Sequence, residues 1–445
     1  MCGIAGLYNR RGEEVDAGLL ERFCRALGHR GPDEQGVMHD GPVGLAHTRL
    51  SIIDLAGGHQ PLYSDDRRLT LIANGEIYNY VELRAELEAR GHRFATHSDC
   101  EPLLYAYREY GDTFLEHVQG MFAFALYDAP RRRLLLARDR LGIKPLFLTV
   151  RPEAIYFGSE LKALFQALPG RPSVNPVGLA QYLESSFTSG ATTLVEGIER
   201  VLPGEMVSIE NGRMERRTYW SPVSVQPMEV DFEQAAQRFD GLLETVMREH
   251  MRTDVPYGLF LSGGVDSSVL LALLTRYAGE PVRTFSVGFA ADSVANELPA
   301  AQAMAQRFQS RHEEIQVDSD RLWRALPHTL WAADELMGDY ASAPTAMLAE
   351  AAGRSLKVVF TGEGGDEVFA GYGRYRASAL KRWLRSLSGG GTGGFRTRGT
   401  FTRIRGHGLF NSELAEADRH WRAPFVAAWR ETPAHWSALQ RMQYV

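Results

Sequence analysis

The first half of the chain is dominated by short apolar runs that are joined in pairs by turn-forming residues. Three such pairs occur, at 123–128 with 133–138, at 145–150 with 154–158, and at 204–210 with 213–220. Paired runs with a short connection are typical of β-hairpins, so they predict antiparallel sheet. Apolar residues at helical spacing predict helices at 80–90 and 99–110, and Asn175-Pro176 is a typical helix start.

From about residue 232 the pattern changes to strands that alternate with helices. Apolar residues at helical spacing begin at Phe232 and continue to Val246. Buried strands are expected at 258–261, 282–289 and 356–361, with helices at 267–277 and 298–308. This alternation predicts a parallel sheet with helices on both faces.

The two patterns predict an α/β protein of two domains, because 445 residues exceed what one hydrophobic core usually organises. The antiparallel domain is expected at 1–220 and the parallel, doubly wound domain at 232–445. Prolines interrupt the stretch between them, so a linker is expected at 221–231. The glycine-rich stretch at 386–408 is interpreted as a flexible loop.

Composition and charge narrow the functional classes. A formal net charge of -6 gives no general attraction to nucleic acid or anionic lipid, so neither partner is expected. Three cysteines, Cys2, Cys24 and Cys100, are too few for a disulfide framework and fit a reducing compartment. No apolar run reaches the ~18 residues of a membrane span, and no secretory signal begins the chain. We therefore expect a cytoplasmic protein.

Cys2 is the first candidate catalytic residue. Removal of Met1 would leave Cys2 with a free α-amino group, whose ordinary pKa of about 7.7 to 8.0 allows it to accept the thiol proton. Thiol and amine then form a nucleophile and its base within one residue. For an isolated Met-Cys pair, the commoner interpretation is a small apolar residue at the start of an edge strand.

Several polar residues farther along the chain are suited to an amino-acid substrate. Arg49 offers a planar donor for a carboxylate, Asn74 and Gly75 follow a strand at 69–73 and supply oxyanion donors, and Glu76 and Asp99 can hold an ammonium group. Each also has a structural interpretation. Arg49 can form a surface ion pair, Asn74-Gly75 a turn, and Asp99 a helix N-cap.

Two glycine-rich segments follow predicted parallel strands. The segment at 262–268 opens a helix and presents backbone N–H groups and hydroxyls that suit a pyrophosphate, although a plain turn also explains it. The segment at 362–369 carries Glu363, Asp366 and Glu367, which suit Mg²⁺ or a reacting centre, although acids are also common at a helix start. Both lie where strands of such sheets end, which is where these folds bind ligands.

The N-terminal motifs resemble the class II glutamine amidotransferase domain of glutamine-hydrolysing asparagine synthetases. The resemblance covers nearly all of 1–220, through the segments at 2–6, 29–33, 49–53, 74–79 and 138–146. It implies an N-terminal-nucleophile αββα sandwich in which Cys2 attacks the glutamine amide and Asn74 and Gly75 stabilise the oxyanion. The implied glutamine-binding residues are Arg49, Leu50, Ser51, Ile52, Ile53, Asn74, Gly75, Glu76 and Asp99.

The second half resembles the ATP-pyrophosphatase (PP-loop) domain of the same family. The resemblance implies ATP contacts by Leu261, Ser262, Gly263, Gly264, Asp266, Ser267, Ser268, Val287, Thr361 and Gly362. It further places Asp266 and Asp366 near Mg²⁺ and implies that Glu363 assists formation of a β-aspartyl-adenylate. The expected small molecules are therefore glutamine, ATP with Mg²⁺, and aspartate or another carboxylate.

The resemblance predicts asparagine synthesis with glutamine as nitrogen donor. A homodimer is a possible assembly. Members of the family continue past the point where this sequence stops, within an expected helix from Trp436, so we expect a fragment that lacks a lysine-bearing segment. Three alternatives remain. These are a relative that amidates a specialised carboxylate in natural-product, peptide or polysaccharide biosynthesis, a sugar-phosphate or phosphoribosyl amidotransferase, and a non-catalytic regulatory protein. The turn at 262–268 argues against the second.

Overall fold

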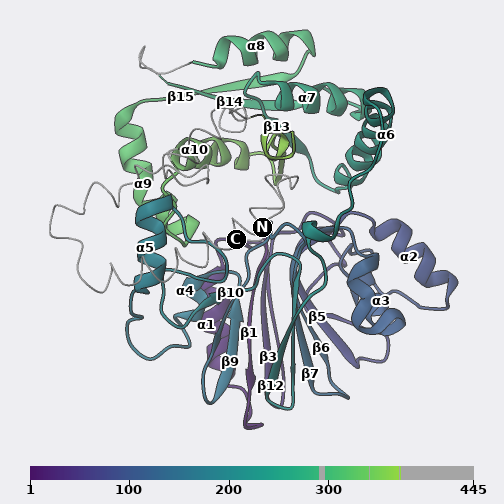
Figure 1. Ribbon diagram of the computed structural model, residues 1–445, viewed down its shortest axis with the longest axis vertical. Coiled ribbons are helices and arrows are strands. Elements are labelled where there is room, and N and C mark those ends of the chain that lie inside the picture. The colour runs from purple at the N-terminus through teal and green to yellow at the C-terminus, as the bar shows by residue number, and fades with distance from the viewer. Residues whose placement is uncertain (290–295, 340, 370, 372–445) are drawn as a thin grey trace, which may run out of the picture. The chain divides into compact units, whose positions relative to one another are not determined.

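The computed structural model describes residues 1–289, 296–339, 341–369 and 371. The chain divides into two compact units (Figure 1). The first contains Met1–Asn175, Ser189–Pro227 and Arg252–Asp254, and the second contains Pro176–Thr188, Met228–Met251 and the chain from Val255. The loop expected at 386–408 and the helix expected from Trp436 lie outside the described residues.

The first unit contains two six-stranded antiparallel sheets. One has the order β10-β8-β9-β1-β3-β2, with β1 (Gly3–Asn9), β2 (Glu34–Asp40), β3 (Val43–Arg49), β8 (Phe147–Val150), β9 (Ala154–Gly158) and β10 (Glu199–Arg200). The other has the order β12-β11-β7-β6-β5-β4, with β4 (Leu62–Tyr63), β5 (Leu69–Ile77), β6 (Gly120–Asp128), β7 (Arg133–Arg138), β11 (Glu205–Glu210) and β12 (Arg213–Thr218). All three predicted hairpins are confirmed.

Helices cover the outer faces of the two sheets (Figure 1). Helices α1 (Ala17–Leu27) and α4 (Leu161–Leu164) pack on the first sheet, and α2 (Tyr80–Ala89), α3 (Pro102–Tyr110) and η1 (Gly111–His117) pack on the second. Alternation along β1 shows why, since Ile4 and Tyr8 enter the core between the sheets whereas Ala5 and Leu7 face α1. The predicted αββα sandwich is confirmed.

Two details of the first unit differ from the sequence interpretation. Strand β1 lies between β9 and β3, so Cys2 does not precede an edge strand. Strand β5 does not stop at 73 but continues to Ile77, so the interpretation of Asn74-Gly75 as a turn is wrong. The reason is that Gly75 has no side chain: a Cβ there would lie 2.3 Å from the carbonyl oxygen of Met121 on β6.

The second unit contains a four-stranded parallel sheet in the order β15-β14-β13-β16. Its strands are β13 (Tyr257–Phe260), β14 (Arg283–Phe289), β15 (Arg311–Val317) and β16 (Val358–Phe360). The strand order reverses between β13 and β16, and ligands of such sheets bind at this switch point. Strand β15 was not predicted, because charged and polar residues occupy most of it and only Ile315 and Val317 form its apolar face.

Helices cover both faces of this sheet, as predicted. On one face α6 (Phe232–His250), α7 (Val265–Tyr277) and α8 (Leu298–Arg307) contribute to a single core with β13. On the other face α9 (Ser319–Ala333) and α10 (Ser342–Gly353) pack on β14 and β15. The unit also contains α5 (Pro176–Ser185) and the short α11 (Gly365–Val368), and η2 (Pro222–Ser224) belongs to the first unit. Within the described ranges, no helix is both long enough and apolar enough to cross a lipid bilayer.

Candidate functional site

Cys2 lies just before β1, beside the point where β3 ends. Its Sγ accepts a hydrogen bond from the Leu50 N–H at 3.4 Å and lies 3.7 Å from the Leu50 carbonyl oxygen. Burial raises the pKa of the Cys2 thiol, and the Leu50 N–H and the nearby N-terminus offset only part of that effect. The thiol is therefore protonated at neutral pH and needs a base to become a nucleophile.

The backbone of Cys2 is held in place by a buried ion-pair network. Arg30 donates from Nε to the Cys2 carbonyl at 2.9 Å and from Nη1 to Glu160 at 2.7 Å. Glu160 also accepts from Lys162 at 2.7 Å and contacts His29 at 3.1 Å. Burial alone would raise the pKa of Glu160, but hydrogen bonds and cationic charge from these partners lower it to about 2. The network keeps Glu160 ionised and fixes the start of β1.

The N-terminal amine in this structure belongs to Met1, the residue before Cys2. Burial is the main reason that its pKa falls from 8.0 to about 6, and the positive charges of Arg30 and Lys144 lower it further, against the opposing effects of Cys2 and Asp33. An amine with that pKa is mostly unprotonated at pH 7. The surroundings of this end of the chain therefore favour an amine in its neutral form.

Asn74 presents an unused hydrogen-bond donor inside the protein. It lies on the face of β5 that turns toward the first sheet, like Ile72 two residues earlier, and is 1% exposed. Its Nδ2 has no hydrogen-bond partner in the described part of the chain. Buried side-chain donors are nearly always paired, so a donor left unpaired in this way suits a ligand oxygen.

The Gly75 N–H adds a second donor beside Asn74. Its partner across β6 is Phe122, whose N–H and carbonyl both bond to Asp139, at 3.2 and 2.8 Å. The Gly75–Phe122 pair is therefore not hydrogen-bonded, and the Gly75 N–H points away from β6. The N–H groups two residues before and after it donate to Gln60 and Asp99.

A partly buried carboxylate, Glu76, and a buried one, Asp99, lie close to these donors. Burial raises the pKa of Glu76 to about 7, with a further contribution from the charge of Asp99, and burial raises the pKa of Asp99 to about 6. Asp99 accepts a hydrogen bond from the Ile77 N–H at 2.9 Å, whereas the N-cap of α3 is Glu101, so the interpretation of Asp99 as an N-cap is wrong. Acids with raised pKa values favour a ligand that brings positive charge.

Arg49 is buried rather than at the surface, so the surface ion-pair interpretation is wrong. It is 4% exposed and donates from Nη1 to Glu34 at 3.0 Å and from Nη2 to the carbonyls of Ile53 and Asp54 at 3.2 and 2.7 Å. These bonds involve only the two terminal nitrogens. They also anchor the loop after β3 that carries Leu50, Ser51, Ile52 and Ile53, in which the Ser51 N–H donates to Asp33 at 2.8 Å.

In the second unit, the loop after β13 forms a tight, internally bonded turn. Gly263 has a φ of +77°, and a Cβ there would lie 2.6 Å from the backbone nitrogen of Ala301. The hydroxyls of Ser262 and Ser267 are 3.0 Å apart, and the Gly264 N–H donates to Ser262 at 3.2 Å. Only glycine satisfies this geometry at Gly263.

The loop after β16 meets the β13 loop at the switch point. Positions for a Cβ at Gly362 and Gly365 lie 3.2 Å from the Asp266 Cβ and 2.4 Å from its carboxylate, so Asp266 contacts this loop directly. Leu261, Thr361 and Glu363 lie on these loops, Val287 lies on β14, and Ser268 lies in the first turn of α7. The second unit thus places the predicted ATP residues at the carboxyl ends of neighbouring strands.

Carboxylates near the switch point are the candidate ligands of a metal ion. In the described ranges, no group of three or more His, Cys, Asp or Glu residues is arranged to hold a metal. Asp266 faces the 362–365 loop, and the carboxylate of Asp366 lies against Gly371. One or two carboxylates are enough for Mg²⁺ when a nucleotide supplies phosphate oxygens, so the residues fit a nucleotide-bound magnesium ion.

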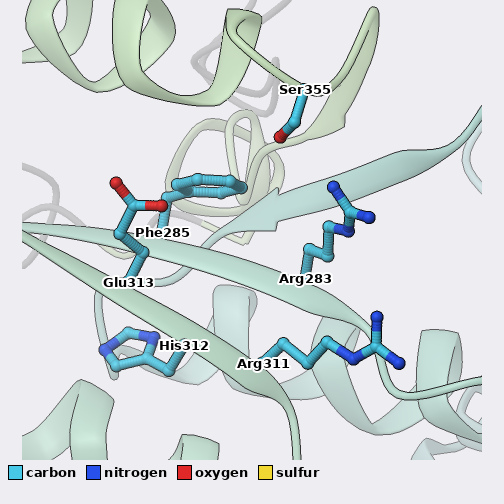
Figure 2. Close-up of a pocket in the computed structure, with 6 residues that line it drawn as sticks. All are labelled: Arg283, Phe285, Arg311, His312, Glu313 and Ser355. Carbon is cyan, nitrogen blue, oxygen red and sulfur yellow. The ribbon is translucent and has the colours of Figure 1, made fainter.

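A separate cavity of about 360 Å³ lies at the opposite edge of the parallel sheet. It is lined by Arg283, Phe285, Arg311, His312, Glu313 and Ser355 (Figure 2). Arg283 and Arg311 are the first residues of β14 and β15. This cavity therefore adjoins the amino ends of the strands and is distinct from the loops at 262–268 and 362–366.

Sequence reasoning missed three residues that shape the first site. Arg30 and Lys144 lie in segments that carried the family resemblance, but no role was inferred for either. Glu160 lay outside those segments, and 130 residues separate it from Arg30. The spacing of residues within a short segment cannot predict an ion pair between residues so far apart in the sequence.

Comparison with known proteins identifies two family models along the chain. Residues 1–220 match "Glutamine amidotransferase domain" and residues 238–445 match "Asparagine synthase". The chain is 35% identical over 394 residues to asparagine synthetase [glutamine-hydrolyzing] 1 of Bacillus subtilis, covering 87% of this chain and 62% of that protein. It therefore spans less than two thirds of that relative.

Two further relatives widen the comparison. The chain is 30% identical to putative asparagine synthetase [glutamine-hydrolyzing] 2 of Methanocaldococcus jannaschii, covering 84% of this chain and 76% of that protein. It is 33% identical to amidase chyE of Penicillium rubens, covering 85% of this chain and 60% of that protein.

Proposed function

Since the chain belongs to the glutamine-hydrolysing asparagine synthetase family, we propose that it is an ATP-dependent carbon–nitrogen ligase. Glutamine is hydrolysed in the first unit, and the ammonia amidates a carboxylate that the second unit has activated with ATP. With aspartate as the acceptor, glutamine, aspartate, ATP and water yield glutamate, asparagine, AMP and diphosphate. Three free cysteines suit a reducing compartment, and we infer a cytoplasmic location.

The observation that carries the proposal is the buried, unpaired amide of Asn74. Amide hydrolysis by a thiolate passes through a tetrahedral intermediate whose oxygen is negatively charged. Donors that are already oriented toward that oxygen stabilise it without reorganisation, and the loss of one typically costs 10² to 10³ in rate. The Asn74 side chain and the Gly75 N–H are such donors.

In this scheme Cys2 supplies both the base, which is its α-amine, and the nucleophile, which is its thiolate. Once Met1 has been removed, the neutral amine of Cys2 takes the thiol proton, and the thiolate attacks the side-chain carbonyl carbon of glutamine. The C–N bond then breaks, and the departing nitrogen leaves with the proton as ammonia. Water, deprotonated by the same amine, hydrolyses the thioester and releases glutamate.

The remaining residues of the first site orient glutamine. Arg49 holds the α-carboxylate through the Nε–H that its bonds to Glu34 and to the loop leave available, and residues 50–53 line that side. Glu76 and Asp99 hold the α-ammonium. The charge of this ammonium offsets the desolvation that raises their pKa values, so binding favours the ionised form of both acids.

In the second site, the loop carrying Ser262, Gly263, Gly264, Ser267 and Ser268 holds the pyrophosphate of ATP. The other ATP contacts are Leu261, Asp266, Val287, Thr361 and Gly362. Asp266 and Asp366 would hold Mg²⁺, which would neutralise phosphate charge. An acceptor carboxylate oxygen attacks the α-phosphorus, diphosphate leaves, and Glu363 assists formation of the acyl-adenylate.

A second candidate acceptor deserves a test because one relative of similar identity carries a different name. Amidase chyE matches this chain about as well as the asparagine synthetases do. An enzyme of this type can amidate a specialised carboxylate with the same two sites. The two candidate functions therefore differ in the carboxylate that accepts the nitrogen, and both use glutamine as the nitrogen donor.

The test measures glutamate release and diphosphate release separately in the full chain. Cys2→Ala should abolish glutamate release from glutamine and leave ammonium-dependent diphosphate release intact. Cys24→Ala, which removes a buried cysteine of α1, should keep both activities. Glutamine hydrolysis by Cys2→Ala at the wild-type rate would refute the scheme. A panel of carboxylic acids then identifies the acceptor, and aspartate is expected to give the highest diphosphate release.

A further inference from the structure

The loop at 50–54, which follows β3, is held by residues from a distant part of the chain. The N–H of Asp254 donates to the Ile52 carbonyl at 3.0 Å, and its carboxylate accepts from the Asp54 N–H at 2.7 Å. The Thr253 hydroxyl donates to the same Ile52 carbonyl at 3.4 Å. Asp254 thus bonds to the loop through both its backbone and its side chain, although 200 residues separate it from Asp54.

The bond from Asp54 to Asp254 completes an unusual backbone arrangement. Asp54 has a φ of +51°, in the left-handed region that residues other than glycine rarely adopt. Its carboxylate accepts from the N–H groups of Gly57 and His97 at 2.9 and 2.8 Å, and its carbonyl accepts from Arg49 at 2.7 Å. Strained backbone persists where several contacts fix it together, so the Asp254 carboxylate helps to set the shape of this loop.

Arg252 attaches the same segment to the end of β5. Its Nη1 donates to the Tyr78 carbonyl and to Glu82, both at 2.7 Å, and its Nη2 donates to Glu82 at 2.6 Å. Tyr78 directly follows β5, the strand that carries residues 74–76. A guanidinium that donates from both terminal nitrogens fixes direction as well as distance. The 252–254 segment therefore bonds to two of the chain segments that carry the proposed glutamine contacts.

This arrangement does not follow from the domain boundaries. Arg252–Asp254 belong to the first compact unit, whereas the chain immediately before and after them belongs to the second. The segment lies outside 1–220, the range that matches the amidotransferase domain, and inside 238–445, the range that matches asparagine synthase. Residues from the second half of the chain therefore contribute to the first unit.

We propose that Arg252 and Asp254 are positioning residues for glutamine, because they join the 50–54 loop to the end of β5. The proposal rests on the proposed function, in which the loop and Arg49 bind the glutamine α-carboxylate and residues 74–76 bind the amide oxygen and the ammonium. Neither Arg252 nor Asp254 contacts glutamine in this scheme. They hold the two sides of the site at a fixed separation before glutamine binds, which reduces the conformational freedom lost on binding. Their loss should therefore weaken glutamine binding more than it slows amide hydrolysis.

The first test compares Asp254→Ala, which removes the acceptor for the Asp54 N–H, with Asp254→Asn, which keeps an acceptor oxygen. In the full chain, Asp254→Ala should raise KM for glutamine about three- to tenfold, the usual effect of one hydrogen bond, and leave kcat within about twofold. Asp254→Asn should stay close to the wild type. The matched control is Asp240→Ala, which removes an exposed acid of α6 and should change neither parameter.

Hydrogen exchange followed by mass spectrometry tests the contact itself, independently of turnover. A peptide that contains Asp54 should exchange faster in Asp254→Ala than in the wild type, because the Asp54 N–H has lost its acceptor. Asp254→Asn and Asp240→Ala should show wild-type exchange.

A second pair of variants tests Arg252. Arg252→Met should raise KM for glutamine by a similar factor, and Arg252→Lys, which keeps the charge but not both nitrogens, should have a smaller effect. The matched control is Arg248→Met, since Arg248 is an exposed arginine of α6 that pairs with Glu244 at 2.8 Å. Ammonium-dependent diphosphate release should be unchanged in every variant.

A folded Asp254→Ala with a wild-type KM for glutamine would overturn the proposal, whether or not its hydrogen exchange changes. So would an equal loss of glutamine-dependent and ammonium-dependent activity, because that result would assign the segment to the second unit. If Asp254→Ala does not fold, the two Arg252 variants decide the question. Failure of the proposed function is distinct, because it would appear as glutamine hydrolysis at the wild-type rate in Cys2→Ala.

Discussion

Under the proposed function, glutamine affinity should depend steeply on pH, because the two acids that we assign to its ammonium are partly protonated before glutamine binds. Glu76 has a pKa raised to about 7 and Asp99 a pKa raised to about 6, in both cases chiefly through burial. The glutamine ammonium stays charged below about pH 8. Protons therefore compete with glutamine for the same two carboxylates, and affinity is lost as the pH falls through 7 and then 6.

The size of the effect follows from those two values. If both acids must be ionised to bind the ammonium, the dissociation constant should be roughly twentyfold larger at pH 6 than at pH 8. At pH 5.5 the factor reaches about one hundred. Because the two carboxylates interact, the two steps belong to the pair rather than to either residue.

Isothermal titration calorimetry on Cys2→Ala measures this affinity without turnover. Titrations from pH 5.5 to 8.5, in buffers that differ in ionisation enthalpy, give both the dissociation constant and the number of protons released on binding. Below pH 7 proton release should accompany binding, since the ammonium lowers the pKa values of both acids.

Two variants make the result specific. Glu76→Gln should remove the upper step and leave a single step near pH 6. Glu88→Gln, an exposed acid of α2 that pairs with Arg84 at 2.9 Å, should leave the profile unchanged. A dissociation constant that is flat from pH 5.5 to 8.5, or one that decreases toward low pH, would refute the assignment of Glu76 and Asp99.

The other two predictions concern one residue in each unit. Asn74→Ala should lower kcat for glutamine hydrolysis about 10² to 10³-fold with little change in KM, since the donor acts on the developing oxyanion. Steady-state measurement of glutamate release checks this prediction. A large change in KM with a normal kcat would contradict it. Gly263→Ala should lower the thermal midpoint of the second unit and abolish diphosphate release while sparing glutaminase activity, because its φ is +77° and a Cβ would meet Ala301. Gly241→Ala, where a Cβ meets nothing within 4 Å, is the matched control and should keep both.

Local pattern in the sequence determined most of the fold. The hairpins and the alternating strands and helices were predictable, because each depends on the spacing of apolar residues and on turn chemistry within a short segment. Strand β15 was not predicted because exposed Arg311 and Glu313 stand at the alternate positions that precede buried Ile315 and Val317, so only two apolar residues mark its packed face. The end of β5 was misplaced because Gly75, which looks like a turn residue, serves instead to admit the backbone of β6.

The sequence by itself also determined which residues carry reactive groups, since Cys2, Asn74, Glu76 and Asp99 are recognisable by type and motif. Only the tertiary structure decided their states. The pairing of Arg30 with Glu160, the unused Asn74 donor and the raised pKa values of Glu76 and Asp99 all arise from burial among segments that are distant along the chain. Desolvation and the distances between charges exist only once those segments have packed together, so no one-dimensional pattern can encode them directly.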